Sequence, residues 1–246
     1  DSGELVSFQR SHVVFTDADG QPAHGFEVAD TIRGVTASRT GALLGIRKND
    51  RSYEVTRRNG QLLGPVLALD GVLPLHAIFS ADDEQLLLGT STGIRLMASD
   101  ELATAISESS GRMGRELNAS SDWRRVVDYA PGTAVDLRSL PDLTRVRSLD
   151  EHDGDVPWAG FSADGQRVYT TSHDRKLRVF DARDGRLLHT WGGARGWLLA
   201  GAAGRVDQQQ VVVTGSRDHR VRIHGDNRQS RFVTSRPVGP VASAAI

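Results

Sequence analysis

Short apolar runs separated by turn-forming residues organise residues 151–192. Four runs with β character follow one another, at residues 156–161, 167–171, 177–180 and 187–191. Turn-forming residues separate them, at 163–166, 173–176 and 182–185. Asp and Gly in these turns suit the positive φ angles of tight hairpins, so the pattern predicts a four-stranded antiparallel meander. One such sheet cannot bury both of its faces, so we expect it to be one copy of a repeated unit.

A sequence repeat supports this expectation. The tetrapeptide Phe-Ser-Ala-Asp occurs at residues 79–82 and again at residues 161–164, which is 82 residues later. This separation is two periods of about 41 residues, a spacing typical of propeller blades. Asp122 stands one period from each copy, and residues 211–223 repeat the run that begins at Val168. The repeat covers almost the whole chain and predicts an all-β propeller of four-stranded antiparallel blades.

The two ends of the chain carry partial copies of the repeat. Residues 14–22 align with residues 179–187, so the chain begins inside a blade. Residues 239–246 align with residues 154–161, so it stops after the first strand of a blade. Because the partial copies are complementary, we expect six blades, with the C-terminal strand completing the N-terminal blade and removing exposed sheet edges. A fragment of a propeller with seven or more blades is the alternative.

The repeat predicts a single propeller domain over residues 1–246. The expected blades share this period and comprise residues 238–246 with 1–28, then 29–69, 70–110, 111–149, 150–192 and 193–237. Residues 100–106 have the local pattern of a helix capped by Asp100. They fall where the outer strand of a blade belongs, so we expect an irregular outer edge there.

One blade carries a more specific pattern. His152, Ser172, Asp174 and Phe180 have a spacing that resembles a WD-repeat blade, in which Gly-His precedes the first strand and Trp-Asp ends the third. The resemblance implies that His152, Ser172 and Asp174 belong to a buried hydrogen-bonded set. Phe180 stands where the family has Trp and has no N–H group to donate, so the set is incomplete.

The last blade keeps part of this pattern. It retains Ser216 and Asp218, and it has His224 at the position of the Trp. Other blades are more degenerate, with Thr92 in place of the turn Asp, for example. The resemblance therefore covers the chain by its period and is specific in two blades. It implies a non-catalytic platform that binds a protein or peptide, such as the sensor or scaffold part of a larger polypeptide.

Composition narrows the classes of partner. The formal net charge of the 246-residue chain is −1, so no global field recruits nucleic acid or an acidic membrane. The absence of cysteine excludes a disulfide scaffold, a thiolate metal site and a cysteine nucleophile. No apolar run approaches the roughly 20 residues that a membrane-spanning helix needs. We therefore expect a monomeric domain with a protein or peptide partner, no nucleic acid or membrane contact, and a cytoplasmic location.

Motifs for chemistry are sparse. Acidic residues cluster at 150–155, but they lack the spacing of an EF-hand loop, and we expect them to be solvated turn residues. The chain has neither a His-Glu-x-x-His nor a Gly-x-Ser-x-Gly motif. The sequence therefore predicts no catalytic residue, no metal site and no cofactor.

A propeller enzyme is the alternative function. Residues 181–191 resemble the end of a blade in quinone-dependent dehydrogenases, with Asp181, Gly185 and Trp191 at the matching positions. That family repeats the Trp in its blades, whereas this chain has it in one. A metal-dependent hydrolase would need Asp, Glu, Asn or His side chains converging on a central channel, and the repeat register predicts no such ring.

The repeat register also predicts a binding rim. In a propeller, the start of each first strand and the turn between the second and third strands lie on one rim around the axis. The rim residues predicted in this way are Phe8, His173 and Arg217 in turns, and Arg33, Asp155 and Trp197 at strand starts. Aromatic and Arg side chains dominate binding energy when they are desolvated, so we expect a partner with an apolar anchor and an acidic flank. Trp197 could instead belong to the core, and we expect Trp158 to pack between blades.

Overall fold

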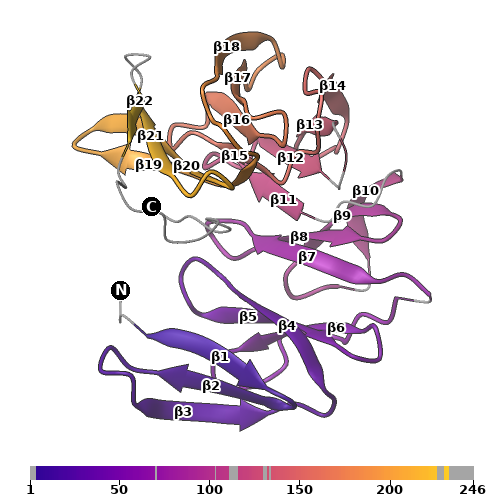
Figure 1. Ribbon diagram of the computed structural model, residues 1–246. Helices are drawn as coiled ribbons and strands as arrows, with labels where there is room; N and C mark the ends of the chain where they lie inside the picture. The colour runs from indigo at the N-terminus through magenta and orange to yellow at the C-terminus, as the bar shows by residue number, and fades with distance from the viewer. Residues whose placement is uncertain are drawn as a thin grey trace. The chain divides into compact units, whose positions relative to one another are not determined.

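The computed structural model describes residues 4–69, 71–102, 104–110, 116–129, 132, 134–225 and 230–232. Over these residues the chain is all-β, with antiparallel sheets of three or four strands and no helix, which confirms the predicted fold class. In this part of the chain no helix could therefore span a membrane. The chain divides into two compact units, Asp1–Gly114 and Arg115–Ile246, and each contains three of the sheets (Figure 1).

The first unit contains sheets 1 to 3. Sheet 1 consists of β1 (Leu5–Gln9), β2 (His12–Thr16) and β3 (Pro22–Glu27). Sheet 2 consists of β4 (Ile32–Ala37), β5 (Leu43–Lys48) and β6 (Tyr53–Arg57). Sheet 3 consists of β7 (Pro74–Phe79), β8 (Gln85–Thr90), β9 (Gly93–Ala98) and β10 (Ala105–Ser110).

Two edges of these sheets differ from a regular four-stranded blade. In sheet 2 the segment after β6 makes only the isolated bridges Tyr53↔Leu67 and Thr56↔Leu62, because Pro65 between them has no N–H group to pair. In sheet 3 the outer strand β10 begins inside residues 100–106, and its pairing with β9 shifts between Ala105 and Ser107. The predicted completion of sheet 1 by residues 238–246 lies outside the described residues.

The second unit contains sheets 4 to 6. Sheet 4 consists of β11 (Glu116–Ala119), β12 (Arg125–Tyr129), β13 (Val135–Ser139) and β14 (Arg145–Leu149). Sheet 5 consists of β15 (Trp158–Phe161), β16 (Arg167–Thr171), β17 (Leu177–Asp181) and β18 (Leu187–Trp191). Sheet 6 consists of β19 (Leu198–Val206), β20 (Gln209–Ser216), β21 (Val221–Gly225) and β22 (Ser230–Phe232). The four strands of sheet 5 are the four runs predicted from the sequence.

Neighbouring sheets share hydrophobic cores, which explains why the middle strands are apolar on both faces. Successive side chains of a strand point to opposite faces. In β16, Val168 joins Phe180 in a core with sheet 4, whereas the next residue, Tyr169, joins Val179 in a core with sheet 6. Trp158 packs against the second of these cores, as expected from the sequence. The first unit has the same design, with one core between sheets 1 and 2 and another between sheets 2 and 3.

The turn between the first and second strands of a sheet repeats one hydrogen-bond pattern. In sheet 5 the Ser162 hydroxyl donates to Asp164 Oδ1 at 2.6 Å, and the backbone N–H of Gln166 donates to the same oxygen at 3.0 Å. The turns of sheets 3 and 4 have the same pair of bonds, to Asp82 and Asp122 respectively. The recurring Phe-Ser-Ala-Asp sequence is therefore the signature of a turn that closes on its own side chains.

Candidate functional site

A buried polar network holds sheet 5 to the loop before it. His152 Nδ1 lies 2.9 Å from Asp174 Oδ2, and His152 Nε2 lies 2.7 Å from Thr170 Oγ1. An ionised carboxylate only accepts hydrogen bonds, so a neutral His152 ring donates to Asp174 from Nδ1 and accepts from Thr170 at Nε2, and the Arg178 guanidinium contacts the same Nδ1. The Ser172 hydroxyl donates to the Gly154 carbonyl at 2.8 Å and accepts from the Asp174 N–H at 3.0 Å. The resemblance implied His152, Ser172 and Asp174, and the structure adds Thr170 to them.

Arg178 is the second residue of this network that sequence reasoning missed. Its Nη1 donates to Asp174 Oδ2 at 2.6 Å, and both side chains are buried, with exposed fractions of 7% and 5%. Burial alone would raise the pKa of Asp174, but hydrogen bonds from Arg178 and His152 lower it to about 2. Burial lowers the pKa of His152 despite the attraction of Asp174. Phe180, at the Trp position, is fully buried and fills the core beside the network.

Sheet 6 repeats most of this network, but its His comes from the third strand instead of the loop before the first strand. Arg222 forms a buried ion pair with Asp218, and the Ser216 hydroxyl donates to the Gly196 carbonyl at 3.2 Å. The hydroxyl of Thr214 shares a hydrogen bond of 3.1 Å with Nε2 of His224, which occupies the Trp position. Burial, and to a lesser degree the positive charge of Arg222, lowers the pKa of His224 to about 4. An Arg four residues after the turn Asp is the sequence signal that could have revealed both ion pairs.

Four of the predicted rim residues, Asp155, His173, Trp197 and Arg217, lie together in the second unit and are called the rim cluster. The His173 ring stacks on Trp197 with the ring centroids 4.7 Å apart. The guanidinium carbon of Arg217 lies 4.8 Å from the Trp197 ring centroid. His173 Nδ1 lies 3.9 Å from Asp155 Oδ2. Trp197 is 45% exposed, so it is a surface residue rather than a core residue.

The backbone positions the rim cluster. The N–H of His173 donates to the carbonyl of Asp155 at 2.9 Å, and the N–H of Arg217 donates to the carbonyl of Trp197 at 2.8 Å. Each bond ties the turn between the second and third strands of a sheet to the segment before its first strand. The same connection in sheets 5 and 6 therefore brings the four side chains onto one surface.

Two predicted rim residues belong to the first unit. Phe8, which was predicted to lie in a turn, lies within β1 opposite Val13 and is 41% exposed. Arg33 is exposed on β4, where its Nε donates to Asn49 Oδ1 at 2.9 Å. The rim cluster therefore consists of the four residues of the second unit, and we build the functional argument on those.

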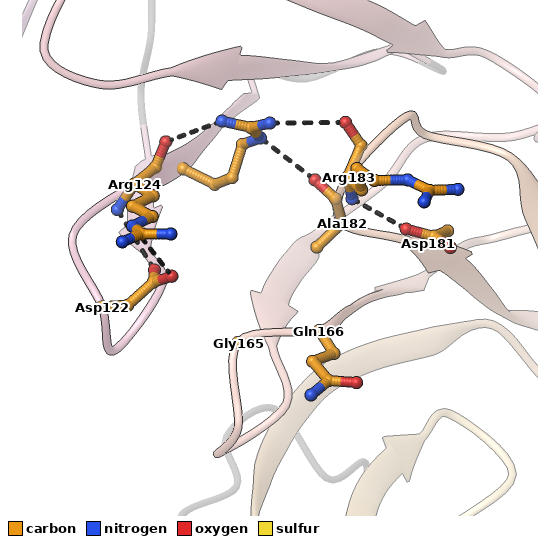
Figure 2. Close-up of a pocket in the computed structure, with 8 residues that line it drawn as sticks. Asp122, Arg124, Gly165, Gln166, Asp181, Ala182 and Arg183 are labelled. Atoms are coloured by element: carbon orange, nitrogen blue, oxygen red, sulfur yellow. Dashed lines mark hydrogen bonds and ion pairs between the residues drawn. The ribbon is translucent and has the colours of Figure 1, made fainter.

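A pocket of about 370 Å³ lies between sheets 4 and 5, at the strand ends opposite to the rim cluster. Figure 2 shows Asp122 and Arg124 on one side of this pocket and Ala182 and Arg183 on the other. Arg125 links the two sheets, because its Nε donates to the Ala182 carbonyl at 3.2 Å and its Nη2 to the Arg183 carbonyl at 3.4 Å. The exposed Arg124 and Arg183 each have an Asp within 4 Å, so the pocket carries no large excess of charge.

The acidic residues at 150–155 do not form a metal centre with their described neighbours. Across the described ranges, no three His, Asp or Glu side chains are grouped closely enough to hold a metal ion. Asp153 is exposed, as expected of a solvated turn residue, and its Oδ2 lies 3.9 Å from Lys176 Nζ.

Comparisons with known proteins bear on the family. The family model described as WD domain, G-beta repeat, matches residues 143–181, which run from the end of sheet 4 through the third strand of sheet 5. A WD repeat-containing protein, SL1-17 of Schistosoma mansoni, is 36% identical over 116 residues. The similar segment covers 45% of this chain and 37% of that relative's length. These similarities confirm the resemblance that the spacing of His152, Asp174 and Phe180 indicated.

Proposed function

With a WD repeat at residues 143–181 as the premise, we propose that this chain is a non-catalytic module that binds a protein or peptide through the rim cluster. WD repeats generally mediate protein interactions, which supports the class of function. The finer part of the proposal is the partner's chemistry, an apolar side chain next to an acidic one.

The geometry of Trp197 carries this proposal. Its exposed indole is held against His173 and Arg217 at centroid distances of 4.7 and 4.8 Å. A side chain that is already oriented loses less conformational freedom when a partner covers it. Trp and Arg are also the residues most enriched among those that dominate binding energy. Trp197 is therefore suited to be the anchor for an apolar side chain of the partner.

The charge beside Trp197 favours an acidic flank. Within the described part of the chain, no Asp or Glu forms an ion pair with Arg217, so its guanidinium is available to a carboxylate of the partner. Asp155, on the His173 side of Trp197, would repel a carboxylate there. A short peptide with one acidic end should therefore bind in one orientation, with its acidic end at Arg217 and away from Asp155.

We expect the double variant Trp197→Ala, Arg217→Glu to bind such a peptide at least about tenfold more weakly, because it removes the anchor and reverses the charge. The ligand would be a peptide selected on the wild-type protein from a displayed random library, and its Kd would be measured by fluorescence anisotropy. Both side chains are on the surface, so the melting temperature should change little.

Arg183→Glu is the matched control, since it makes the same charge change at the opposite strand ends. It should leave the Kd of the peptide unchanged. Equal binding by the double variant and the wild type would contradict the proposed site. A large fall in the melting temperature of Trp197→Ala would assign the residue a structural role instead. A quinone or a metal ion found in the purified protein by mass spectrometry would contradict the non-catalytic part of the proposal.

A further inference from the structure

A second pocket, of about 240 Å³, lies in the first unit between β4 and β7, which are the first strands of sheets 2 and 3. Its polar lining comes from Thr36, Arg47, Tyr53 and His76. Its other walls are glycine or apolar, and include Gly34 and Val35 on β4 and Pro74 and Ala77 on β7. We call it the Arg47 pocket, after the charged side chain that joins its two walls.

Arg47 has donors to spare on one edge. Its Nη1 donates to the Leu75 carbonyl at 2.9 Å and to the Pro74 carbonyl at 3.3 Å, and its Nη2 donates to the Arg33 carbonyl at 3.0 Å. A guanidinium has five N–H groups, so the Nε–H and the second Nη2–H remain. The Nε and Nη2 edge of a guanidinium can bind a carboxylate through two parallel hydrogen bonds. In the described residues no Asp or Glu forms an ion pair with Arg47.

Glycine leaves that edge of Arg47 uncovered. A Cβ atom added to Gly34 would lie 3.3 Å from Nη2 and 3.4 Å from Nε. Such a contact is tighter than ordinary packing, and it would cover the two nitrogens that have donors left. The missing side chain at Gly34 therefore gives the pocket access to the charged edge.

The phenol of Tyr53 is a second donor in the pocket. Tyr53 is 3% exposed, and among the described residues its Oη interacts with the Thr36 side chain but makes no hydrogen bond of normal geometry. A Cβ atom at Gly45 would collide with Oη, so the glycine at this position leaves room for the Tyr53 phenol. Burial raises the pKa of Tyr53, although nearby Thr36 and Arg47 act in the opposite direction, so the phenol stays protonated. A buried hydroxyl without a well-formed hydrogen bond destabilises the fold, and an acceptor bound in the pocket would remove this cost.

We propose that the Arg47 pocket binds a carboxylate group, with the Nε and Nη2 edge of Arg47 and the Tyr53 hydroxyl as donors. A carboxylate is planar, carries a negative charge that balances the positive charge of Arg47, and offers enough lone pairs for three donors. At roughly 30 Å³ per water molecule, the pocket has room for about eight waters, which is enough for a small mono- or dicarboxylic acid. The pocket is in the first unit, so this proposal is independent of the rim cluster.

The test is a titration of the isotope-labelled protein with sodium acetate and sodium succinate, followed by NMR of the Arg47 Nε–H and the Tyr53 ring. Sodium chloride at matched ionic strength is the control. We expect saturable shifts with the carboxylates and none with chloride. Tyr53→Phe should weaken binding by about tenfold or more, since it removes one hydrogen bond to a charged group. Gly34→Ala, which covers the Arg47 edge, should weaken binding as well.

Tyr129→Phe is the matched control, because the Tyr129 phenol is buried in the second unit and bonds the Ala159 backbone. It should leave carboxylate binding unchanged but lower the melting temperature, whereas Tyr53→Phe should not lower it.

A second arm of the titration compares the peptide acetyl-Gly-Glu-Gly-amide with its Gln counterpart. Shifts with the Glu peptide alone would support the proposal and assign the carboxylate to a partner chain. The proposal is overturned if neither acids nor peptide produce saturable shifts, if chloride matches them, or if Tyr53→Phe and wild type bind equally.

Discussion

Replacement of Asp174 by Ala should lower the free energy of unfolding by about 3–5 kcal/mol, the range for removing one partner of a buried ion pair. The Arg178 guanidinium would stay buried without a carboxylate, because its side chain is only 7% exposed. His152 would lose the acceptor of its Nδ1 proton at the same time. Urea unfolding followed by tryptophan fluorescence would measure the loss.

A second substitution tests the physical cause of this loss. If the unpaired buried charge of Arg178 causes most of the loss, adding Arg178→Met to Asp174→Ala should restore most of the stability. Apolar replacements of buried ion pairs often leave the free energy of unfolding unchanged. Asp184→Ala is the control, because this carboxylate pairs with Arg183 at the surface, where ion pairs contribute about 0–1 kcal/mol. A loss below about 1 kcal/mol for Asp174→Ala would contradict a stabilising role of the network.

The pH dependence of the same site has a defined sign. The pKa of Asp174 is lowered in the folded protein from its ordinary value of 3.8 to about 2. A carboxyl group with a lowered folded pKa contributes stability above its unfolded pKa, and this contribution is lost as the pH falls through the folded pKa. Wild-type stability should therefore fall between about pH 4 and pH 2, and Asp174→Ala should lack this part of the fall.

The second large effect is a loss of stability in mild acid caused by His224. The pKa of this buried His is lowered from 6.5 to about 4, so between these values the unfolded chain binds a proton that the folded protein excludes. Stability contributed by neutral His224 is full above about pH 6.5 and is lost as the pH falls to about 4. The shift corresponds to about 3 kcal/mol. The buried His152 changes stability in the same direction.

His224→Phe should remove the His224 part of this pH dependence, because the variant has no proton to bind there. Phe occupies the equivalent position in sheet 5, as Phe180. Thr214→Val, which removes the hydroxyl bonded to His224 but keeps the His buried, should retain the slope. Unfolding free energies at pH 7 and pH 5 would measure both variants. An unchanged slope in His224→Phe would contradict the assignment, as would an NMR titration of His224 near pH 6.5.

Local sequence patterns account for much of the fold. The Asp at 82, 122 and 164 recurs because each closes a turn with hydrogen bonds to its own segment, independently of the rest of the chain. The four runs of sheet 5 were predictable because their alternating faces each meet a neighbouring sheet. Residues 100–106 show the limit of such reasoning, since their local pattern favours a helix, whereas the outer strand β10 begins at Ala105 and pairs with β9.

The candidate sites needed more than local patterns. The repeat register placed Asp155, His173, Trp197 and Arg217 at equivalent positions, yet only the packed sheets decide that their side chains touch. Thr170 and Arg178 look like ordinary strand residues until the loop carrying His152 folds over them.

For this protein, the chain sequence by itself determined the repeat, the turns and the WD-type pattern, because each depends on contacts among residues a few positions apart. Tertiary structure alone decided that Trp197 is exposed rather than buried, and that Arg47 and Tyr53 face one pocket. The physical reason is that both features depend on contacts between neighbouring sheets, such as His173 with Trp197 and Arg47 with the Leu75 carbonyl, whose residues are far apart in the sequence.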